Sequence, residues 1–413
     1  MSSEDKEDKE DKEDKEDSEE KEEFLPLIID LGNNYFRLGR AGKDFPEIIA
    51  PSVYVDNTDY LFSSDVIDGL EEIFITEKNA ETYLFGDEAL KYSNILNLHE
   101  FKKEGNFNIF MKFFYHHYKQ LKISAENQFK QPIIILSPFF TSELEKTKLK
   151  DIFFNVFDFP SLLFLPDSQG ILSILQKSSG VIINLGEVYT SITTFFHGFS
   201  NELARDTYPI AGKELTSYLL NLILTRRGSG KIEYLDIKIA KEIKEKSSLC
   251  IFDTEGEVKR IKDGFTKYNR TIDLPDDSSL EINSERFMLV EPLFNPSLIH
   301  IDYIGLPEAI SKIIKVWERE NWEDLIPNII LAGGGSLIPG LDKKLKFEIS
   351  KFFSNRLREK INVIAASGRE NISWIGTSVL WAQGKLKKGW INNPNPKASE
   401  DEQKIESDNQ PNS

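Results

Sequence analysis

The sequence predicts a mixed α/β fold built from two similar halves. Two stretches, residues 27–39 and 180–192, share one order of residues: an apolar strand, a polar residue, a glycine, a turn and a second strand. Around them, apolar runs typical of buried strands alternate with amphipathic helical patterns. That alternation is typical of α/β proteins with mixed sheets. The chain has 413 residues, which is long enough for two domains.

The first of these stretches carries side chains suited to an anion and a cation. Its first strand leads through Asp30 to Gly32, and the turn Asn33-Asn34 follows before the apolar alternation resumes. Backbone N–H groups of such a turn can bind phosphate. Asp30 can face a hydrated cation, and Arg37 can reach back to a phosphate oxygen. An ordinary surface hairpin is the alternative, but a second copy of the pattern favours two halves that face each other across a nucleotide.

Composition limits the class of protein. The chain is 40% hydrophobic and 11% aromatic, so each half can form a core, and no apolar run approaches the length of a membrane span. The acidic N-terminus does not resemble a signal peptide. The single cysteine, Cys250, excludes an intramolecular disulfide and favours a reducing compartment. The five histidines show no metal-ligand spacing, and packing is the better interpretation of His116 and His117.

The net charge of −17 is concentrated at the ends of the chain. Residues 1–23 contain nine Glu, five Asp and five Lys in an almost regular repeat, and the segment 394–413 is Pro/Asn-rich and then acidic. Neither segment has the apolar residues needed to offset the entropy of ordering, so both are expected to be disordered tails. The first can be a solvated tail or a docking segment for a basic partner. No basic stripe emerges, which argues against direct nucleic-acid binding.

The remaining patterns predict the order of elements. In the first half they are short strands and turns over 53–98, with 83–90 the clearest, a helix over 107–122, a strand over 132–138, a helix over 141–156 capped by Ser142 with Glu145, a strand over 161–165 and a helix over 169–176. In the second half they are a strand over 191–196, helices over 212–224 and 232–246, a hairpin over 271–287 that turns at 274–277, a helix over 307–319, a strand over 329–332, a helix from about 341 and a last helix through Trp381.

A glycine-rich turn follows the strand 329–332. Gly333, Gly334 and Gly335 have no Cβ, so their backbone can lie flat against a ligand. The N-terminus of the helix just beyond adds a favourable dipole for phosphate. A tight strand-to-helix turn without a ligand is the alternative.

Short motifs, many of them with glycine, occur along the chain at 30–32 with 39–42, 46 and 51–52, at 86–89, 168–173, 184–187, 211–216, 244–246, 283–287 and 293–297, at 332–336 with 339–340, and at 374–376. Any one of them is weak. In this order and at this spacing the sequence resembles the actin family, within the wider group that includes sugar kinases and heat-shock chaperone ATPases. The similarity covers roughly residues 26–393.

The resemblance implies an actin-like (ribonuclease H-like) α/β fold, duplicated and two-lobed, with four subdomains around a nucleotide cleft. It implies ATP or ADP with Mg²⁺ as cofactors. The cofactor-binding residues that it implies are Gly32, Asn33, Asn34, Tyr35, Arg37, Gly186, Glu187, Val188, Lys244, Glu245, Gly333, Gly334, Gly335 and Ser336. Asp30 and Asn184 would hold the metal through water, and Gln169 stands where the family places its water-orienting glutamine.

The resemblance also implies a division of the chain. The expected parts are an acidic tail 1–23, subdomain 1 (24–51, 101–176 and 372–393), subdomain 2 (52–100), subdomain 3 (177–211 and 294–371), subdomain 4 (212–293) and a tail 394–413.

Several residues depart from the family pattern. Asn33-Asn34 replaces Ser and Gly, Asn184 replaces an Asp near the hydrated Mg²⁺, Ser191 replaces a His near the attacking water, and Glu370 replaces a Lys close to the base. Phosphoryl transfer depends on positioning and on charge neutralisation, and loss of one positioned group commonly costs ~10²-fold in rate. The departures therefore predict weak or absent hydrolysis, unless neighbouring groups compensate.

The segment 53–82 lacks the Gly/Met-rich tip of the matching actin segment, which docks into the next subunit in filaments. It is acidic instead, with Asp56, Asp59, Asp65, Asp68, Glu71 and Glu72. The segment 294–306 stays largely apolar. These features favour a divergent actin-related protein over a conventional actin.

We expect an ATP-binding structural protein of the cytoplasmic cytoskeleton or a subunit of a larger complex, and possible weak ATPase activity. Its partners would be other actin-family subunits or itself, and actin-binding or complex proteins. The alternatives are a filament-forming ATPase and a nuclear chromatin-remodelling subunit. A metabolic kinase is disfavoured because no acidic base for a sugar site can be placed.

Overall fold

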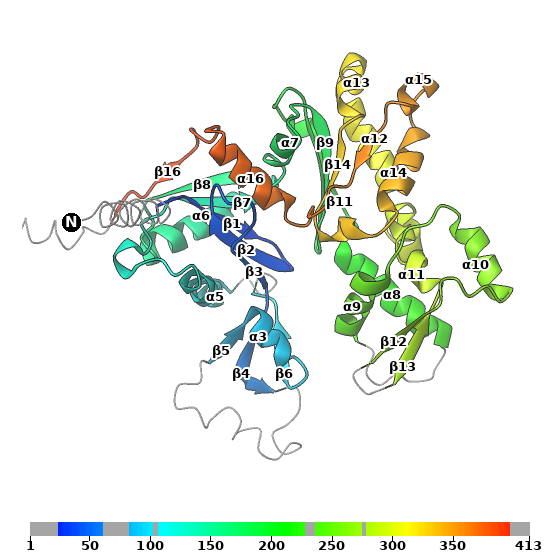
Figure 1. The fold of residues 1–413 in the computed structure, drawn as a ribbon, viewed down its shortest axis with the longest axis horizontal. Helices are drawn as coiled ribbons and strands as arrows, with labels where there is room; N and C mark the ends of the chain where they lie inside the picture. The colour runs from blue at the N-terminus through cyan, green and yellow to red at the C-terminus, as the bar shows by residue number, and fades with distance from the viewer. Residues whose placement is uncertain (1–23, 61–81, 102–105, 228–235, 275–277, 397–413) are drawn as a thin grey trace, which may run out of the picture. The chain divides into compact units, whose positions relative to one another are not determined.

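The chain forms two compact units, residues Met1–Gly170 with Trp374–Ser413 and residues Ile171–Ser373 (Figure 1). The computed structural model describes residues 24–60, 82–101, 106–227, 236–274 and 278–396. Both predicted tails, apart from residues 394–396, lie outside these ranges. So do the acidic residues Asp65, Asp68, Glu71 and Glu72, and most of the predicted turn at 274–277.

Unit 1 is built on a six-stranded sheet with the order β16-β8-β7-β1-β2-β3. β1, β2 and β3 are antiparallel neighbours, whereas β7 runs parallel to β1 and β8 runs parallel to β7. The strands β5-β4-β6 form a separate three-stranded sheet in this unit. The strands are β1 (Leu27–Leu31), β2 (Tyr35–Arg40), β3 (Ile48–Pro51), β4 (Tyr54–Tyr60), β5 (Tyr83–Phe85), β6 (Leu96–His99), β7 (Ile133–Ser137), β8 (Ser161–Pro166) and β16 (Ile391–Asn392).

Helices cover both faces of the six-stranded sheet. Successive side chains of a strand point to opposite faces, so neighbouring residues of β1 pack on different helices. On one face, Leu27 and Ile29 pack with the aromatic side chains of α5. On the other, Ile28 packs with Trp374 of α16. The helices of unit 1 are α3 (Gly86–Lys91), α5 (Phe107–Lys119), α6 (Glu143–Asp151), the π-helical segment η3 (Ile152–Val156), the 3-10 turn η2 (Ala125–Asn127) and α16 (Ile372–Ala382), whose first two residues belong to unit 2.

Unit 2 repeats the same sheet plan. Its five-stranded sheet has the order β11-β10-β9-β14-β15, with antiparallel pairing on one side of β9 and parallel pairing on the other. This order and these directions match β3-β2-β1-β7-β8 of unit 1. The strands are β9 (Gly180–Leu185), β10 (Thr190–Phe195), β11 (Arg205–Tyr208), β14 (Ile329–Ala332) and β15 (Val363–Ile364), with a separate hairpin of β12 (Arg270–Asp273) and β13 (Ser279–Ile282).

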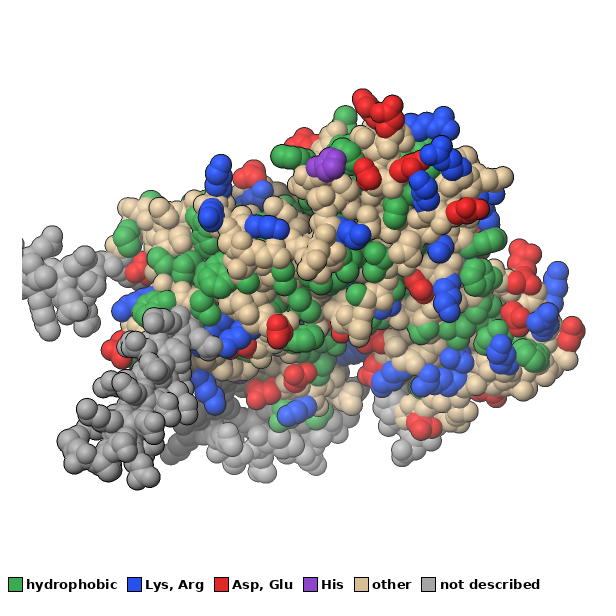
Figure 2. Space-filling model, turned by 45° about the horizontal axis from the view of Figure 1, so that its top comes forward, with side chains coloured by type: hydrophobic (Ala, Val, Ile, Leu, Met, Phe, Trp, Pro, Cys, Tyr) green, Lys and Arg blue, Asp and Glu red, His purple; other side chains and the backbone are tan. Residues whose placement is uncertain are grey.

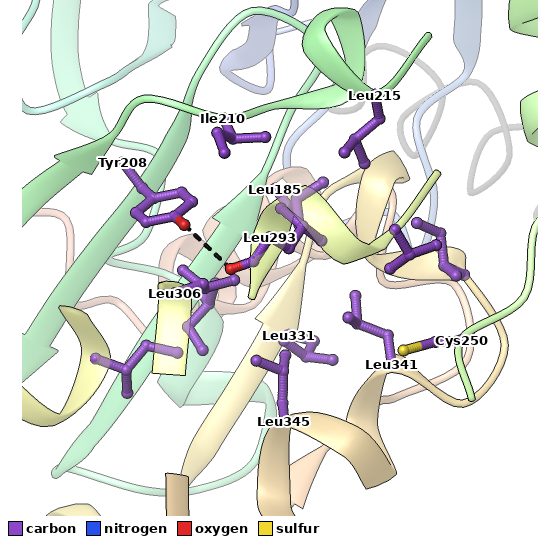
Figure 3. Close-up of a cluster of buried hydrophobic side chains, with 14 of the residues drawn as sticks. Leu185, Tyr208, Ile210, Leu215, Cys250, Leu293, Leu306, Leu331, Leu341 and Leu345 are labelled. Atoms are coloured by element: carbon purple, nitrogen blue, oxygen red, sulfur yellow. Dashed lines mark hydrogen bonds between the residues drawn. The ribbon is translucent and has the colours of Figure 1, made fainter. Parts of the chain in front are cut away.

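The core of unit 2 lies between this sheet and its helices. Figure 3 shows Leu185, Leu331 and Leu341 from two strands and a helix in one buried cluster, where the Tyr208 hydroxyl donates to the Leu293 carbonyl oxygen at 3.0 Å. The helices are α7 (Ile171–Ile174), α8 (Gly212–Arg227), α9 (Ile237–Ser247), α10 (Thr254–Lys262), α11 (Glu285–Met288), α12 (Leu306–Lys315), α13 (Trp322–Leu325), α14 (Leu341–Ser350) and α15 (Asn355–Arg358), with 3-10 turns η4 (Glu202–Ala204), η5 (Glu291–Leu293), η6 (Pro296–Ile299), η7 (Arg319–Asn321) and η8 (Gly334–Leu337).

The predicted fold class is confirmed, and the differences are local. The predicted helix 141–156 changes to π-helix after Asp151, where the bulky sequence Ile-Phe-Phe packs into the aromatic core. The predicted hairpin 271–287 is wrong beyond Ile282, because Glu285–Met288 is helical. The predicted helix 169–176 shortens to four residues, and α10 was not predicted because none of its residues is buried.

Candidate functional site: two glycine hairpins

The first hairpin turn, between β1 and β2, depends on a glycine. A Cβ on Gly32 would lie 2.3 Å from the Tyr35 carbonyl oxygen, which no side chain can do without moving the backbone. Ser52 holds the turn from outside, since its N–H donates to the Asn34 carbonyl at 2.9 Å and its hydroxyl donates to the Gly32 carbonyl at 2.8 Å. The turn is therefore fixed by its own backbone and by the end of β3.

Asp30 and Arg37 face each other across this hairpin. They are cross-strand partners, and the Arg37 Nη1 donates to the Asp30 Oδ2 at 3.0 Å. Their side chains are only 20% and 10% exposed. The sequence suggested that Asp30 faces a cation and that Arg37 reaches a phosphate, whereas here the two side chains pair with each other. Either group must exchange this contact for a ligand, or share it, before it acts as predicted.

Gln169 lies at the same edge of the sheet as Asp30. β1, β7 and β8 are parallel, so their carboxyl ends meet at one edge. Gln169 is exposed in the turn that follows β8, and its N–H donates to the Pro166 carbonyl at 3.0 Å. The next residue, Gly170, packs against the backbone of Gly376, where a Cβ would come within 2.4 Å. This contact fixes the position of the turn that carries Gln169.

The second hairpin turn, between β9 and β10, repeats the first. The Gly186 N–H donates to the Tyr189 carbonyl at 3.0 Å, and a Cβ on Gly186 would lie 2.8 Å from the same oxygen. The start of α8 supports the turn, because the Gly212 N–H donates to the Gly186 carbonyl at 2.9 Å. Asn184 and Ser191 are the cross-strand pair here, at the positions that Asp30 and Arg37 occupy in the first hairpin.

A buried lysine fixes the acidic residue of the second turn. The Lys244 ammonium group donates to the Gly212 carbonyl at 2.7 Å and to the Glu187 Oε2 at 3.3 Å. Burial lowers the pKa of Lys244, and the charge of Glu187 opposes that shift. The next residue of α9, Glu245, is exposed. The structure thus brings together Glu187 and Lys244, which the resemblance implied separately.

The glycine-rich turn after β14 packs on the end of β9. Gly333 has φ +81°, and a Cβ there would lie 2.5 Å from the Asn184 Oδ1 and from the Leu185 carbonyl oxygen. A Cβ on Gly335 would overlap the Leu185 side chain. Only Gly334 faces open space. Two of the three glycines are therefore required by packing, and Gly334 alone leaves room for a ligand.

The predicted helix N-terminus is not adjacent to these glycines. The 3-10 turn η8 follows Gly333 directly, and α14 starts at Leu341, where Gly340 packs against the Cys250 carbonyl. The expectation that the α14 dipole acts on a phosphate at the glycine turn is therefore weakened.

Arg369 holds the glycine turn in place, a role that the sequence did not indicate. Its guanidinium donates to the Ser336 hydroxyl at 3.1 Å and to the Ser336 carbonyl at 2.8 Å. Its own carbonyl accepts from the Gly333 N–H at 3.1 Å. Ser336 is fully buried. An arginine that binds only backbone and hydroxyl groups leaves no signal of charge pairing in the sequence.

The predicted site residues form two groups. Unit 1 holds one group, which consists of Asp30, Gly32, Asn33, Asn34, Tyr35, Arg37 and Gln169. Unit 2 holds the other, which consists of Asn184, Gly186, Glu187, Val188, Ser191, Lys244, Glu245, Gly333, Gly334, Gly335 and Ser336. Ser191 is buried, and Tyr35 and Val188 are exposed at the turns.

Within the described ranges, no three His, Cys, Asp or Glu side chains gather into a metal-binding group. Mg²⁺ keeps several waters and needs only one or two carboxylates beside substrate phosphates. The Asp30 carboxylate of unit 1 and the Asn184 amide oxygen of unit 2 are each of a type that accepts hydrogen bonds from such waters.

Two comparisons with known proteins found related sequences. A protein-family model described as Actin matches residues 21–395. Putative actin-29 from Dictyostelium discoideum is 26% identical over 363 residues, which cover 86% of this chain and 89% of that protein. Among the helices that the structure describes, none has the length and apolar character needed to cross a bilayer.

Proposed function

The chain belongs to the actin family, and we propose that it is a structural actin-related protein that binds ATP or ADP with Mg²⁺. One observation carries this proposal. Two hairpins with the same register and the same glycine-dependent turn stand at equivalent places in the two sheets. In this proposal the N–H groups of each turn, near Gly32 in unit 1 and near Gly186 in unit 2, are donors to nucleotide phosphates.

The other predicted residues take roles around the same ligand. Lys244 and Glu245 would contact the ribose and base, and Gly334 would lie against the adenosine. Mg²⁺ would neutralise phosphate charge when bound. Asp30 and Asn184 would orient its water ligands. Arg37 would exchange part of its bond to Asp30 for a phosphate oxygen, since a guanidinium can serve two acceptors.

We propose that hydrolysis is slow or absent. Gln169 is exposed and can orient a water, but Ser191 and Asn184 supply no base and no second carboxylate. A buried serine in the middle of a sheet cannot replace the imidazole that the family places there. Each missing group accounts for about 10²-fold in rate.

Nucleotide would then act chiefly as a clamp that stabilises the folded state by mass action. Assembly with other actin-family subunits, with itself or with complex proteins would be the output. A cytoplasmic, cytoskeletal location follows most directly from this role. Nuclear complexes, including chromatin-remodelling assemblies, are the second candidate.

The test is thermal unfolding of the purified protein with and without Mg-ATP. At a hundredfold excess over Kd, binding stabilises by about 2.7 kcal/mol, which raises Tm by about 3 °C for a chain of this size. An unchanged Tm, with no bound nucleotide after gel filtration, would contradict nucleotide binding. Pelleting after addition of ATP and salt distinguishes the alternatives, because a critical concentration would indicate a filament-forming protein.

A further inference from the structure

The segment between α16 and β16 presents three lysines on a fixed loop. We call residues 384–389 the lysine loop. Two backbone hydrogen bonds hold it: the Gly384 N–H donates to the Trp381 carbonyl at 2.8 Å, and the Lys385 N–H donates to the Leu380 carbonyl at 3.1 Å. Leu386 packs on the core beside Trp374. The charged side chains of Lys385, Lys387 and Lys388 remain exposed.

These three lysines lack the partners that several other lysines of unit 1 have. Lys146 pairs with Glu143 at 2.8 Å, and Lys112, Lys119 and Lys148 lie over aromatic rings. On the face drawn in Figure 2, basic side chains are interspersed with acidic ones. Among the described residues, Lys385, Lys387 and Lys388 have no ion pair and no ring contact. The loop therefore carries three uncompensated positive charges within four residues.

The N-terminal segment is anchored beside the same helix. The Pro26 carbonyl accepts from the Ala41 N–H at 2.7 Å, and Ala41 is buried in the cluster that contains Leu380 and, at its margin, Leu386. The adjacent Gly42 N–H donates to the Ser378 hydroxyl of α16 at 2.8 Å. The fourteen acidic residues of the segment 1–23 are therefore tethered to the core cluster on which the lysine loop packs.

We propose that the acidic N-terminal segment, residues 4–23, binds the lysine loop of the same chain. A random coil of 20 residues has an end-to-end distance of about 25 Å. Tethering gives it an effective concentration in the millimolar range. This inference does not depend on nucleotide binding.

The first test is zero-length carbodiimide cross-linking of the full chain, read by mass spectrometry. Cross-links from the acids of residues 4–23 to Lys385, Lys387 or Lys388 should exceed those to the lysines of α6 by at least about fivefold at 0.01 M salt. They should fall steeply at 1 M salt, because the screening length drops from about 30 Å to about 3 Å. The Glu143–Lys146 cross-link is the internal control for reagent activity. Equal yields at both lysine sets would overturn the proposal. In a mixture of isotope-labelled and unlabelled protein, cross-links that join only a labelled to an unlabelled chain would also overturn it, because they form between two copies.

The second test uses an acidic peptide of about 20 glutamates as the competitor, with the full chain and a chain lacking residues 1–23. Removing the segment should tighten peptide binding by about tenfold, because the tethered competitor is lost. K385Q/K387Q/K388Q should abolish that gain, whereas the matched control K146Q/K148Q/K150Q should keep it. Equal affinity of the full and shortened chains, or an equal effect of the two triple variants, would contradict the proposal.

Discussion

The two hairpins share one backbone and differ in charge. In each turn, a Cβ added to the glycine would lie within 2.8 Å of the carbonyl oxygen of the tyrosine three residues later. In each, a segment further along the chain also hydrogen-bonds to the turn. The cross-strand pair before the turn is an ion pair in the first hairpin, Asp30 with Arg37, and a neutral pair in the second, Asn184 with Ser191. The backbone and the chemistry of this repeat therefore vary independently.

The packing behind the hairpins differs in the same way. Phe36 of the first hairpin contacts Phe113 edge-on and stacks on His117 at 5.8 Å. The equivalent residue of the second hairpin is Thr190, whose hydroxyl donates to the Ile210 carbonyl at 2.7 Å. The titratable group behind the first hairpin is thus a buried imidazole, His117, whereas the second hairpin has the Lys244–Glu187 ion pair at its turn. Acidification that protonates His117 should therefore act on unit 1.

The largest expected effect comes from giving the second hairpin the family's charged groups. In Asn184→Asp with Ser191→His, we expect phosphate release from Mg-ATP to rise by at least about 10²-fold, because a carboxylate and a base are restored. Single-turnover phosphate release measures the effect, with each single variant as the control. If the double variant still gains thermal stability from Mg-ATP but hydrolyses no faster, then other groups limit the reaction.

A second effect should appear on acidification. Burial, with a smaller contribution from His116, lowers the pKa of His117 to about 4. The folded state therefore binds fewer protons than the unfolded state between pH 6.5 and pH 4, so the free energy of unfolding falls as pH falls through that range. The loss from this group is about 3 kcal/mol. Urea unfolding at several pH values measures it.

The matched variants for this prediction are His117→Leu and His116→Leu. The first should remove most of the pH dependence between 6.5 and 4, because no buried imidazole remains to be protonated. The second should leave most of it. An identical pH slope in wild type and His117→Leu would show that other groups cause the acid sensitivity.

A third prediction concerns the ion pair of the first hairpin. Asp30→Asn leaves the Arg37 guanidinium 10% exposed and without its carboxylate, which should lower the free energy of unfolding by about 2 kcal/mol. Asp30→Asn with Arg37→Ser imitates the neutral pair of the second hairpin and should recover most of that loss. Both variants should gain less Tm from Mg-ATP than wild type. If the single variant is as stable as wild type, the pair does not support the hairpin.

The backbone repeat was predictable from the sequence because its causes are local. The apolar runs 27–29 and 181–183 predict buried strands, and Gly32 and Gly186 predict the turns. The parallel neighbours β7 and β14 were also predictable, since both are continuous apolar runs. Each of these elements is specified within about ten residues of sequence.

The missed features depend on contacts between distant residues. Arg369 binds Ser336 33 residues away, and Lys244 binds Glu187 57 residues away. Nothing in the local sequence reports such pairs. Likewise, Gly333 and Gly335 suggested a ligand surface, and only their distances to Asn184 and Leu185 reveal that packing requires them.

The smallest predicted effect compares the two turn glycines. Gly32→Ala should lower the free energy of unfolding by about 2 kcal/mol and Gly186→Ala by about 1 kcal/mol, because the added methyl group meets a carbonyl oxygen at 2.3 Å in the first and 2.8 Å in the second. Gly334→Ala is the control, since a Cβ there meets nothing within 4 Å, and its stability should stay within about 0.5 kcal/mol of wild type. The effect of Mg-ATP should be the opposite: of the three glycine variants, Gly334→Ala should lose the largest part of the ligand-induced rise in Tm. If this turn lies against the nucleotide, that variant loses most of the ligand-induced rise in Tm, and an undiminished rise would place the ligand elsewhere.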